Sequence, residues 1–396
     1  MSVQKFEIKF DNPTCVYYVG QQVSGSATLI TTKEKKIRGI CLRVKGAADV
    51  YWTESRSVTG SDGNSETQTV TYSAHELYAH IEIWLVGSPC GEMMLPPGKH
   101  TYPFSYTLPH NIPSSFEGIH GHVRYTVKVE VVRPWRFDYK SKAAFTVLTP
   151  LDLNLEPGMQ EPVQNTREKY LCCCCCRSGP VTLVCSVHRG FVPGQKIEAI
   201  VECDNVTTEE VSVNCYLEKV VTFKSSCGST NCCQSMVAME RLGVVKANAS
   251  NAWRTKLTVP VLPPSHLKYC NYIDITYLLW VKGVITGFHN TVFLRTEVII
   301  GTIPLRNYFL SIFSSVPEVP SGSASPQGEE PPPSFESAVV APSAPPMEPG
   351  SLYTDLPPPT YEECLLIKGN IRDKEDNEHT YGAMDFAPRY PMYNFR

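Results

Sequence analysis

The chain has 396 residues, of which 42% are hydrophobic and 19% charged, and its formal net charge is −3. This length allows two domains and a tail, and the composition is typical of a globular protein. Because the charge is slightly negative, no basic field favours nucleic acid as a partner. The first residues lack an apolar signal-peptide core, and the most apolar stretch, 273–288, is interrupted by charges and is too short for a bilayer span. We therefore expect a soluble, cytoplasmic protein.

Apolar and polar residues alternate over most of the first three hundred residues, beginning with residues 6–10, 23–29 and 40–44. The period is clearest over 125–131, where one tyrosine and three valines alternate with Thr126, Lys128 and Glu130. A strand with this period buries one face and exposes the other to water, as strands of antiparallel sandwiches do. The pattern therefore predicts β-sandwich domains and places Lys128 and Glu130 on a solvent-facing side.

Three blocks of this pattern occur twice in the same order, which indicates a duplicated domain. The paired blocks are 18–23 with 191–197, 37–42 with 211–217, and 123–129 with 275–281. The interval from Gly20 to Tyr125 is 105 residues and that from Gly194 to Tyr277 is 83, so the first copy carries 22 extra residues. We place much of this excess in a polar surface loop over 54–66.

Composition divides the chain into four parts. The first domain covers 1–150, a proline-containing linker with a cysteine run covers 151–177, and the second domain covers 178–306. The tail covers 307–396, and 13 of the 32 prolines lie between Pro317 and Pro359. Such a segment buries too little apolar surface to offset its ordering entropy, so we expect a disordered tail with polyproline II bias.

With these features the sequence resembles the α-arrestins, or arrestin-domain-containing proteins, over nearly its whole length. The residues that carry the resemblance are 95–100, 102–104, 108–109 and 113–118 in the first domain, and 178–180, 191–194 and 300–305 in the second. The resemblance implies an all-β fold of two tandem arrestin-type, immunoglobulin-like sandwiches. It also implies an adaptor that links membrane receptors or transporters to WW-domain ubiquitin ligases of the HECT type and promotes endocytosis. Such an adaptor would be recruited to the plasma membrane and endosomes.

The motif with the most direct chemical meaning is Pro-Pro-x-Tyr, formed by Pro358, Pro359, Thr360 and Tyr361. A WW domain binds the two prolines in polyproline II form in an aromatic groove, and a second pocket takes the tyrosine ring. A chance match in a proline-rich linker is the alternative. Many α-arrestins carry two such motifs, but here the upstream candidate, 332–335, ends in phenylalanine. We therefore expect one working WW ligand and little avidity from a second.

A second short motif lies earlier in the tail, where Pro342, Ser343, Ala344 and Pro345 resemble the P-[ST]-A-P late-domain motif. That motif binds the ubiquitin-conjugating-enzyme-variant domain of ESCRT-I. It supports an alternative function as a vesicle-budding scaffold. Chance is again the rival interpretation, because proline, serine and alanine are common in this tail.

Five of the 16 cysteines run consecutively, an awkward geometry for a disulfide framework. They are Cys172, Cys173, Cys174, Cys175 and Cys176. Three interpretations stay open: small apolar side chains in a strand or linker, reversible S-acylation with peripheral membrane contact, and metal binding. Adjacent cysteines lack the two-residue spacing of zinc sites, which disfavours the third.

Catalytic signatures are missing from the sequence: we find no Gly-x-Ser-x-Gly, Walker loop, Rossmann fingerprint or His-Glu-x-x-His. We therefore expect a chain that is not an enzyme and that needs no cofactor or metal. A third hypothesis is a redox regulator that binds thioredoxin, by analogy with one α-arrestin. No particular cysteine marks that role.

Overall fold

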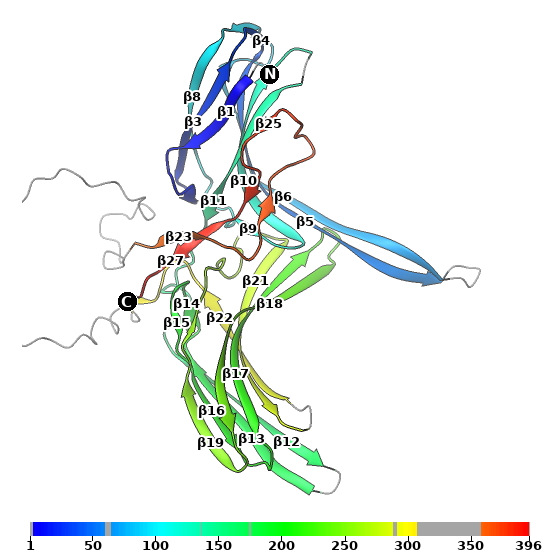
Figure 1. The fold of residues 1–396 in the computed structure, drawn as a ribbon, viewed down its shortest axis with the longest axis vertical. Helices are drawn as coiled ribbons and strands as arrows, with labels where there is room; N and C mark the ends of the chain where they lie inside the picture. Colours follow the sequence, from blue (N-terminus) through cyan, green and yellow to red (C-terminus); the bar gives the residue numbers. More distant parts are fainter. Residues whose placement is uncertain are drawn as a thin grey trace, which may run out of the picture.

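The computed structural model of the chain describes residues 3–59, 65–135, 137–173, 176–287, 291–306 and 358–395, with the backbone alone from 171 to 178. Every element named in these ranges is a strand. Figure 1 shows two β-sandwiches arranged end to end, with C-terminal residues lying across their junction. The predicted all-β architecture of two tandem sandwiches is confirmed.

The N-terminal sandwich packs a three-stranded sheet, ordered β1-β3-β8, against a larger sheet, ordered β2-β11-β10-β5-β6. Its strands are β1 (Val3–Phe10), β2 (Val16–Tyr18), β3 (Gln22–Thr31), β4 (Lys35–Ile37), β5 (Gly39–Thr59), β6 (Ser65–Gly87), β7 (Met93–Leu95), β8 (Gly98–Thr107), β9 (Phe116–Glu117), β10 (Gly121–Val132) and β11 (Tyr139–Leu148). The alternating apolar residues face inward: Leu29, Val127 and Phe145 are at most 1% exposed. Burial of these faces holds the two sheets together.

The C-terminal sandwich repeats this plan with sheets ordered β12-β13-β16-β19 and β14-β22-β21-β17-β18. Its strands are β12 (Val163–Cys173), β13 (Cys176–Val187), β14 (Gly190–Phe191), β15 (Lys196–Ile197), β16 (Ile200–Asn205), β17 (Val211–Lys224), β18 (Thr230–Val245), β19 (Ala249–Arg254), β20 (Leu257–Thr258), β21 (Ile273–Ile285) and β22 (Thr291–Ile300). In each domain a short strand runs parallel to the last long strand, β2 beside β11 and β14 beside β22.

Two buried tyrosines mark equivalent positions in the two copies. Tyr125 lies in β10 and Tyr277 in β21, and neither side chain is exposed. The Tyr125 hydroxyl donates to the carbonyl of Pro113 at 2.7 Å, and the Tyr277 hydroxyl donates to that of Pro263 at 2.8 Å. A buried phenol needs such an acceptor. The same hydrogen bond from a buried tyrosine in both domains agrees with the duplication inferred from the sequence.

The extra residues of the first copy lie largely in a long hairpin rather than in a loop. β5 and β6 have 21 and 23 residues, each seven more than β17 and β18, which have 14 and 16. The expected surface loop over 54–66 is therefore wrong for its described residues. They continue the ladder, with Val58 opposite Glu66, because threonine and valine suit extended backbone. Figure 1 shows this hairpin projecting from the junction of the domains.

The linker between the domains is shorter than the predicted 151–177. β12 begins at Val163, so most of the second half of that range is a strand paired with β13. Residues 163–170 do not alternate apolar with polar side chains, so no period-two pattern marked this strand in the sequence. The linker itself is fixed: the Leu151 amide donates to the Thr302 hydroxyl at 2.8 Å, and Leu153 is fully buried.

The two sandwiches also contact each other directly, through a continuous cluster of buried apolar residues. The ring of His120 meets that of Phe223 edge-on at 5.6 Å. The Ser226 amide donates to the Ser73 carbonyl at 3.0 Å, near the projecting hairpin. The interface therefore orients the N- and C-terminal sandwiches relative to each other.

The end of the chain differs from the disordered tail expected over 307–396. Residues 307–357 lie outside the described residues, but 358–395, here called the C-terminal segment, form five short strands. These are β23 (Thr360–Glu363), β24 (Gly369–Asn370), β25 (Thr380–Tyr381), β26 (Asp385–Phe386) and β27 (Arg389–Met392). The segment is ordered because its aromatic and acidic side chains contact residues of the sandwiches.

Candidate functional site

The predicted WW-binding motif begins the C-terminal segment and is only partly accessible. Pro358 and Thr360 are exposed, whereas Pro359 and Tyr361 are half-buried. β23 pairs antiparallel with β27, which places Tyr361 opposite Pro391. The Thr360 hydroxyl donates to the carbonyl of Met392 at 3.2 Å. The motif is thus one strand of a two-stranded ribbon.

The Tyr361 ring is held against the N-terminal sandwich. Its hydroxyl lies 3.3 Å from the hydroxyl of Tyr18, where either atom can donate. Its ring packs against a buried cluster that contains Tyr18, Leu148, Cys364 and Tyr390. Burial raises the pKa of the Tyr361 phenol, so the hydroxyl stays protonated near neutral pH. The Tyr361 side chain, which a WW pocket would have to bind, is therefore already engaged in contacts within the protein.

Two tyrosines of the C-terminal segment fasten this ribbon to the two sandwiches. Tyr390 is 1% exposed, and its hydroxyl donates to the carbonyl of Ser115 in the N-terminal domain at 2.9 Å. Tyr393 is buried, and its hydroxyl donates to the carbonyl of Thr302 at 2.8 Å, beyond the last strand of the C-terminal domain. Its amide donates to Pro193 at 3.1 Å. Both phenols thus satisfy buried carbonyls that would otherwise lack a donor.

Glycine at position 194 permits this close approach. Gly194 has a φ of +91°, a region that favours glycine, and a Cβ atom there would overlap the carbonyl oxygen of Tyr393. The Phe-Val-Pro-Gly turn that marked the second domain in the sequence therefore also contacts the backbone of the C-terminal segment at Tyr393. This role was missed because nothing in the turn itself points to a distant partner.

A second attachment is electrostatic and lies on the N-terminal sheet. Lys128 on β10 stands opposite Lys142 on β11 in the strand register, and Lys140 lies on the same strand as Lys142. We call these three residues the lysine cluster. Only 9% of Lys128 and 4% of Lys142 is exposed, and Glu130, which is 2% exposed, provides the sheet's own counter-charge. Like charges opposite each other and out of water need further anions.

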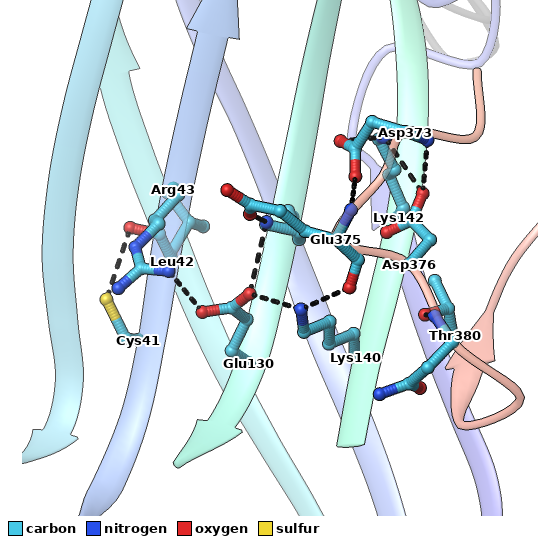
Figure 2. A network of polar contacts seen from close by, with 12 residues as sticks. Cys41, Leu42, Arg43, Glu130, Lys140, Lys142, Asp373, Glu375, Asp376 and Thr380 are labelled. Atoms are coloured by element: carbon cyan, nitrogen blue, oxygen red, sulfur yellow. Dashed lines mark hydrogen bonds and ion pairs between the residues drawn. The ribbon is translucent and has the colours of Figure 1, made fainter. Parts of the chain in front are cut away.

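The acidic loop of the C-terminal segment, residues 373–376, supplies those anions (Figure 2). The Lys142 ammonium lies 2.7 Å from a carboxylate oxygen of Asp373 and 3.1 Å from one of Asp376. The Lys128 ammonium lies 2.9 Å from a carboxylate oxygen of Glu375. The loop thus covers the lysine cluster with three carboxylates.

The protonation of these groups reflects the pairing. Burial alone would raise the pKa of Asp373, but the hydrogen bond and charge of Lys142 lower it below its ordinary value. The hydrogen bond from Lys128 lowers the pKa of Glu375. Burial would lower the pKa of Lys128, but Glu375 and Glu130 raise it. The docked arrangement therefore stabilises the charged forms of the Lys128 ammonium and of the Asp373 and Glu375 carboxylates.

The alternation over 125–131 predicted that Lys128 and Glu130 face water, and this prediction is wrong. The alternation located the strand correctly, but the outer face is covered by the C-terminal segment. Further contacts extend the cover: β25 runs parallel to β11, and Arg124 donates to the carbonyl of Asn370 at 2.7 Å. The available signal was the lysine cluster itself, together with the acidic run at 373–376.

The remaining predicted sites are less fully described. Pro342, Ser343, Ala344 and Pro345, and the upstream motif at 332–335, lie outside the described residues. Cys172, Cys173 and Cys176 lie at the end of the β12–β13 hairpin, far from the N-terminal sandwich in Figure 1, and Cys174 and Cys175 are outside the described residues. The S-acylation prediction is therefore untested.

No helix in the described ranges is long and apolar enough to cross a membrane. Among the described side chains, no group of three or more histidine, cysteine, aspartate or glutamate residues could hold a metal ion.

Two tandem sandwiches of shared topology define a two-domain arrestin fold, and comparison with known proteins agrees. The model of the arrestin N-terminal domain matches residues 6–154, and that of the arrestin C-terminal domain matches residues 177–305. Arrestin domain-containing protein 17 of Caenorhabditis elegans is 28% identical over 430 aligned positions, which cover 99% of both chains. Human arrestin domain-containing protein 4 is 29% identical over 74% of this chain and 69% of its own length.

Rat arrestin domain-containing protein 1 is 29% identical over 71% of this chain and 61% of its own length. The chain belongs to the arrestin family, among the arrestin domain-containing proteins known as α-arrestins. An arrestin-like adaptor role follows from this membership.

Proposed function

We propose that this protein is an adaptor that brings WW-domain ubiquitin ligases of the HECT type to membrane cargo. The observation that carries the proposal is the Pro358–Tyr361 motif, placed at the start of the C-terminal segment. Pro358 and Thr360 lie on the surface there. The motif contains the proline pair and the aromatic ring that the two pockets of a WW domain recognise.

The chemistry of ubiquitin transfer belongs to the recruited ligase. The adaptor raises the effective concentration of the ligase near cargo lysines by holding both on one molecule. The chain between Arg306 and Pro358 spans 51 residues, numbered 307–357, and separates the sandwiches' last strand from the motif. Such a length allows a bound ligase a wide reach.

Cargo in this proposal consists of membrane receptors or transporters, contacted by the sandwiches. The protein acts from the cytoplasm and is recruited to the plasma membrane and endosomes, where it promotes ubiquitination, endocytosis and protein transport. Two additional features are kept as predictions: ESCRT-I recruitment through Pro342–Pro345, and S-acylation of the Cys172–Cys176 run at a hairpin end distant from the N-terminal domain.

The test is binding of a purified WW domain from a HECT-type ligase to a peptide covering Met347–Lys368. We expect specific binding that is lost in Tyr361→Ala, because the aromatic pocket is left empty. Thr360→Ala is the matched control: it changes a neighbouring side chain at the position the motif leaves open, and binding should persist. Equal binding by the wild-type and Tyr361→Ala peptides, or no binding by either, would refute the ligase-adaptor function.

A further inference from the structure

We propose that the sandwiches and the WW domain compete for Tyr361, so that the docked C-terminal segment withholds the ligase-binding motif until it is released. This inference rests on the proposed function and adds the regulation of its site. The surface concerned is the junction of the two domains together with the outer face of β10 and β11. Its occupant is the chain's own residues 358–395.

The competition follows first from the tyrosine side chain. One ring cannot lie in a WW pocket while it packs against Leu148 and Tyr390 with its hydroxyl 3.3 Å from that of Tyr18. A WW domain must therefore extract the Tyr361 side chain from the protein before it can bind. The affinity of the full-length chain is then the intrinsic affinity reduced by the fraction of molecules in which the motif is free.

The backbone imposes the same exclusion. Residues 360–363 form β23 and pair with residues 389–392 of β27 over four positions. The Cys364 amide continues this pairing by donating to the Pro388 carbonyl at 2.9 Å. A WW groove binds its ligand in polyproline II form, whereas Thr360 and Tyr361 are here paired with β27 in a β-ribbon. Engagement therefore requires the ribbon to open or to leave the sandwiches as a whole.

The acidic loop makes this release adjustable without altering the motif. Asp373, Glu375 and Asp376 contact the lysine cluster, and among the described residues no hydrogen bond or ion pair joins any of the three to residues 358–361. The Glu375 side chain is 70% exposed and that of Asp373 is 39% exposed, so salt screens part of this attraction. Weakening the contacts of the acidic loop lowers the fraction of molecules in which the C-terminal segment is docked. The sequence of the WW-binding motif stays unchanged.

The experiment compares WW-domain affinity for three molecules: the peptide Met347–Lys368, the full-length protein, and full-length Asp373→Asn/Asp376→Asn. We expect the full-length protein to bind about tenfold or more weakly than the peptide, which corresponds to about 1.4 kcal/mol in favour of docking. The double variant should recover most of this loss. Its amides at 361–364 should also exchange faster with deuterium, an effect independent of any WW domain.

A matched control removes two charges from the same segment at positions that form no ion pair with the lysine cluster in the described residues. Glu378→Gln/Asp385→Asn makes the same change in net charge, and its affinity should equal that of the wild-type full-length protein. Raising salt from about 0.1 to about 1 M shortens the Debye length from about 10 to about 3 Å. The ratio of full-length to peptide affinity should then rise, because the exposed part of this attraction is screened, while the tyrosine contacts remain.

The outcomes separate the two proposals. If the peptide binds and the full-length protein binds equally well, the competition is refuted while the adaptor function stands. If the control variant gains as much affinity as the acidic-loop variant, the electrostatic part of the inference is wrong. If the peptide does not bind, the adaptor function fails, and faster exchange at 361–364 in the double variant still reports whether the acidic loop holds the segment.

Discussion

Removing the Tyr390 side chain should detach the C-terminal segment without unfolding the sandwiches. Tyr390 is 1% exposed and its hydroxyl donates to Ser115. Tyr390→Phe leaves that buried carbonyl without its donor, which costs about 1–3 kcal/mol. Tyr390→Ala also leaves a cavity, and truncation of a large aromatic side chain costs about 3–5 kcal/mol. A local unit of five short strands has a small opening free energy, so the alanine variant should be largely undocked.

Hydrogen exchange followed by mass spectrometry directly measures how often the C-terminal segment opens. For Tyr390→Phe we expect the amides of 360–364 and 389–393 to exchange about fivefold faster or more, since 1.4 kcal/mol is a factor of ten, and full undocking sets the upper limit. Strand β21 around Tyr277 should keep its protection. Tyr51→Ala is the control, because Tyr51 is 60% exposed on the long hairpin and its loss removes a tyrosine of similar size at little cost.

Two results would refute the reasoning. Unchanged exchange at 360–364 in both Tyr390 variants would mean that the tyrosine does not hold the segment. Equal loss of protection in β21 would mean that the segment and the sandwiches unfold as one unit, so that release of the motif without loss of the fold is impossible.

Two further predictions concern titration. Asp373 and Glu375 have lowered pKa values when docked, so their contribution to docking is complete above their ordinary values, 3.8 and 4.5, and is lost as the pH falls through the lowered ones. Exchange at 371–376, corrected for its intrinsic pH dependence, should show weaker protection at about pH 3 than at about pH 7; equal protection would contradict this sign. Hydrogen bonds with Ser225 and Ser229 lower the pKa of the Cys227 thiol to about 7, and this cysteine is exposed. Cys227 should therefore be alkylated faster near neutral pH than the buried Cys215. Ser225→Ala should slow the alkylation of Cys227. Equal rates in wild type and variant would show that Ser225 does not activate the thiol.

Much of the fold was predictable because alternation directly reports a strand with one buried face. The period over 125–131 located β10, and the repeated blocks located its counterpart β21. Strand length was less accessible: polar residues at 54–59 and 65–66 read as a loop but extend a hairpin, since a hairpin that projects from the body needs no apolar face along its full length.

The C-terminal segment shows why the site was only half predictable. The Pro358–Tyr361 motif is recognisable because its chemistry lies in four adjacent residues. Its masking depends on partners such as Tyr18 and Lys142, more than 200 positions away in the sequence, and no local pattern specifies them. The abundance of proline up to Pro359 suggested disorder, whereas the aromatic and acidic residues that follow mark a segment able to pay its ordering entropy by docking.

The position of Tyr390 and Tyr393 has a consequence for motion between the domains. These residues are three positions apart, yet the first holds Ser115 of the N-terminal domain and the second holds Thr302 at the end of the C-terminal domain. So short a stretch cannot lengthen much, and a change in the angle between the sandwiches strains one of its two anchors. Any ligand that favours another interdomain angle would thereby loosen the segment. By thermodynamic reciprocity, a bound WW domain would strengthen the binding of that ligand by the same factor.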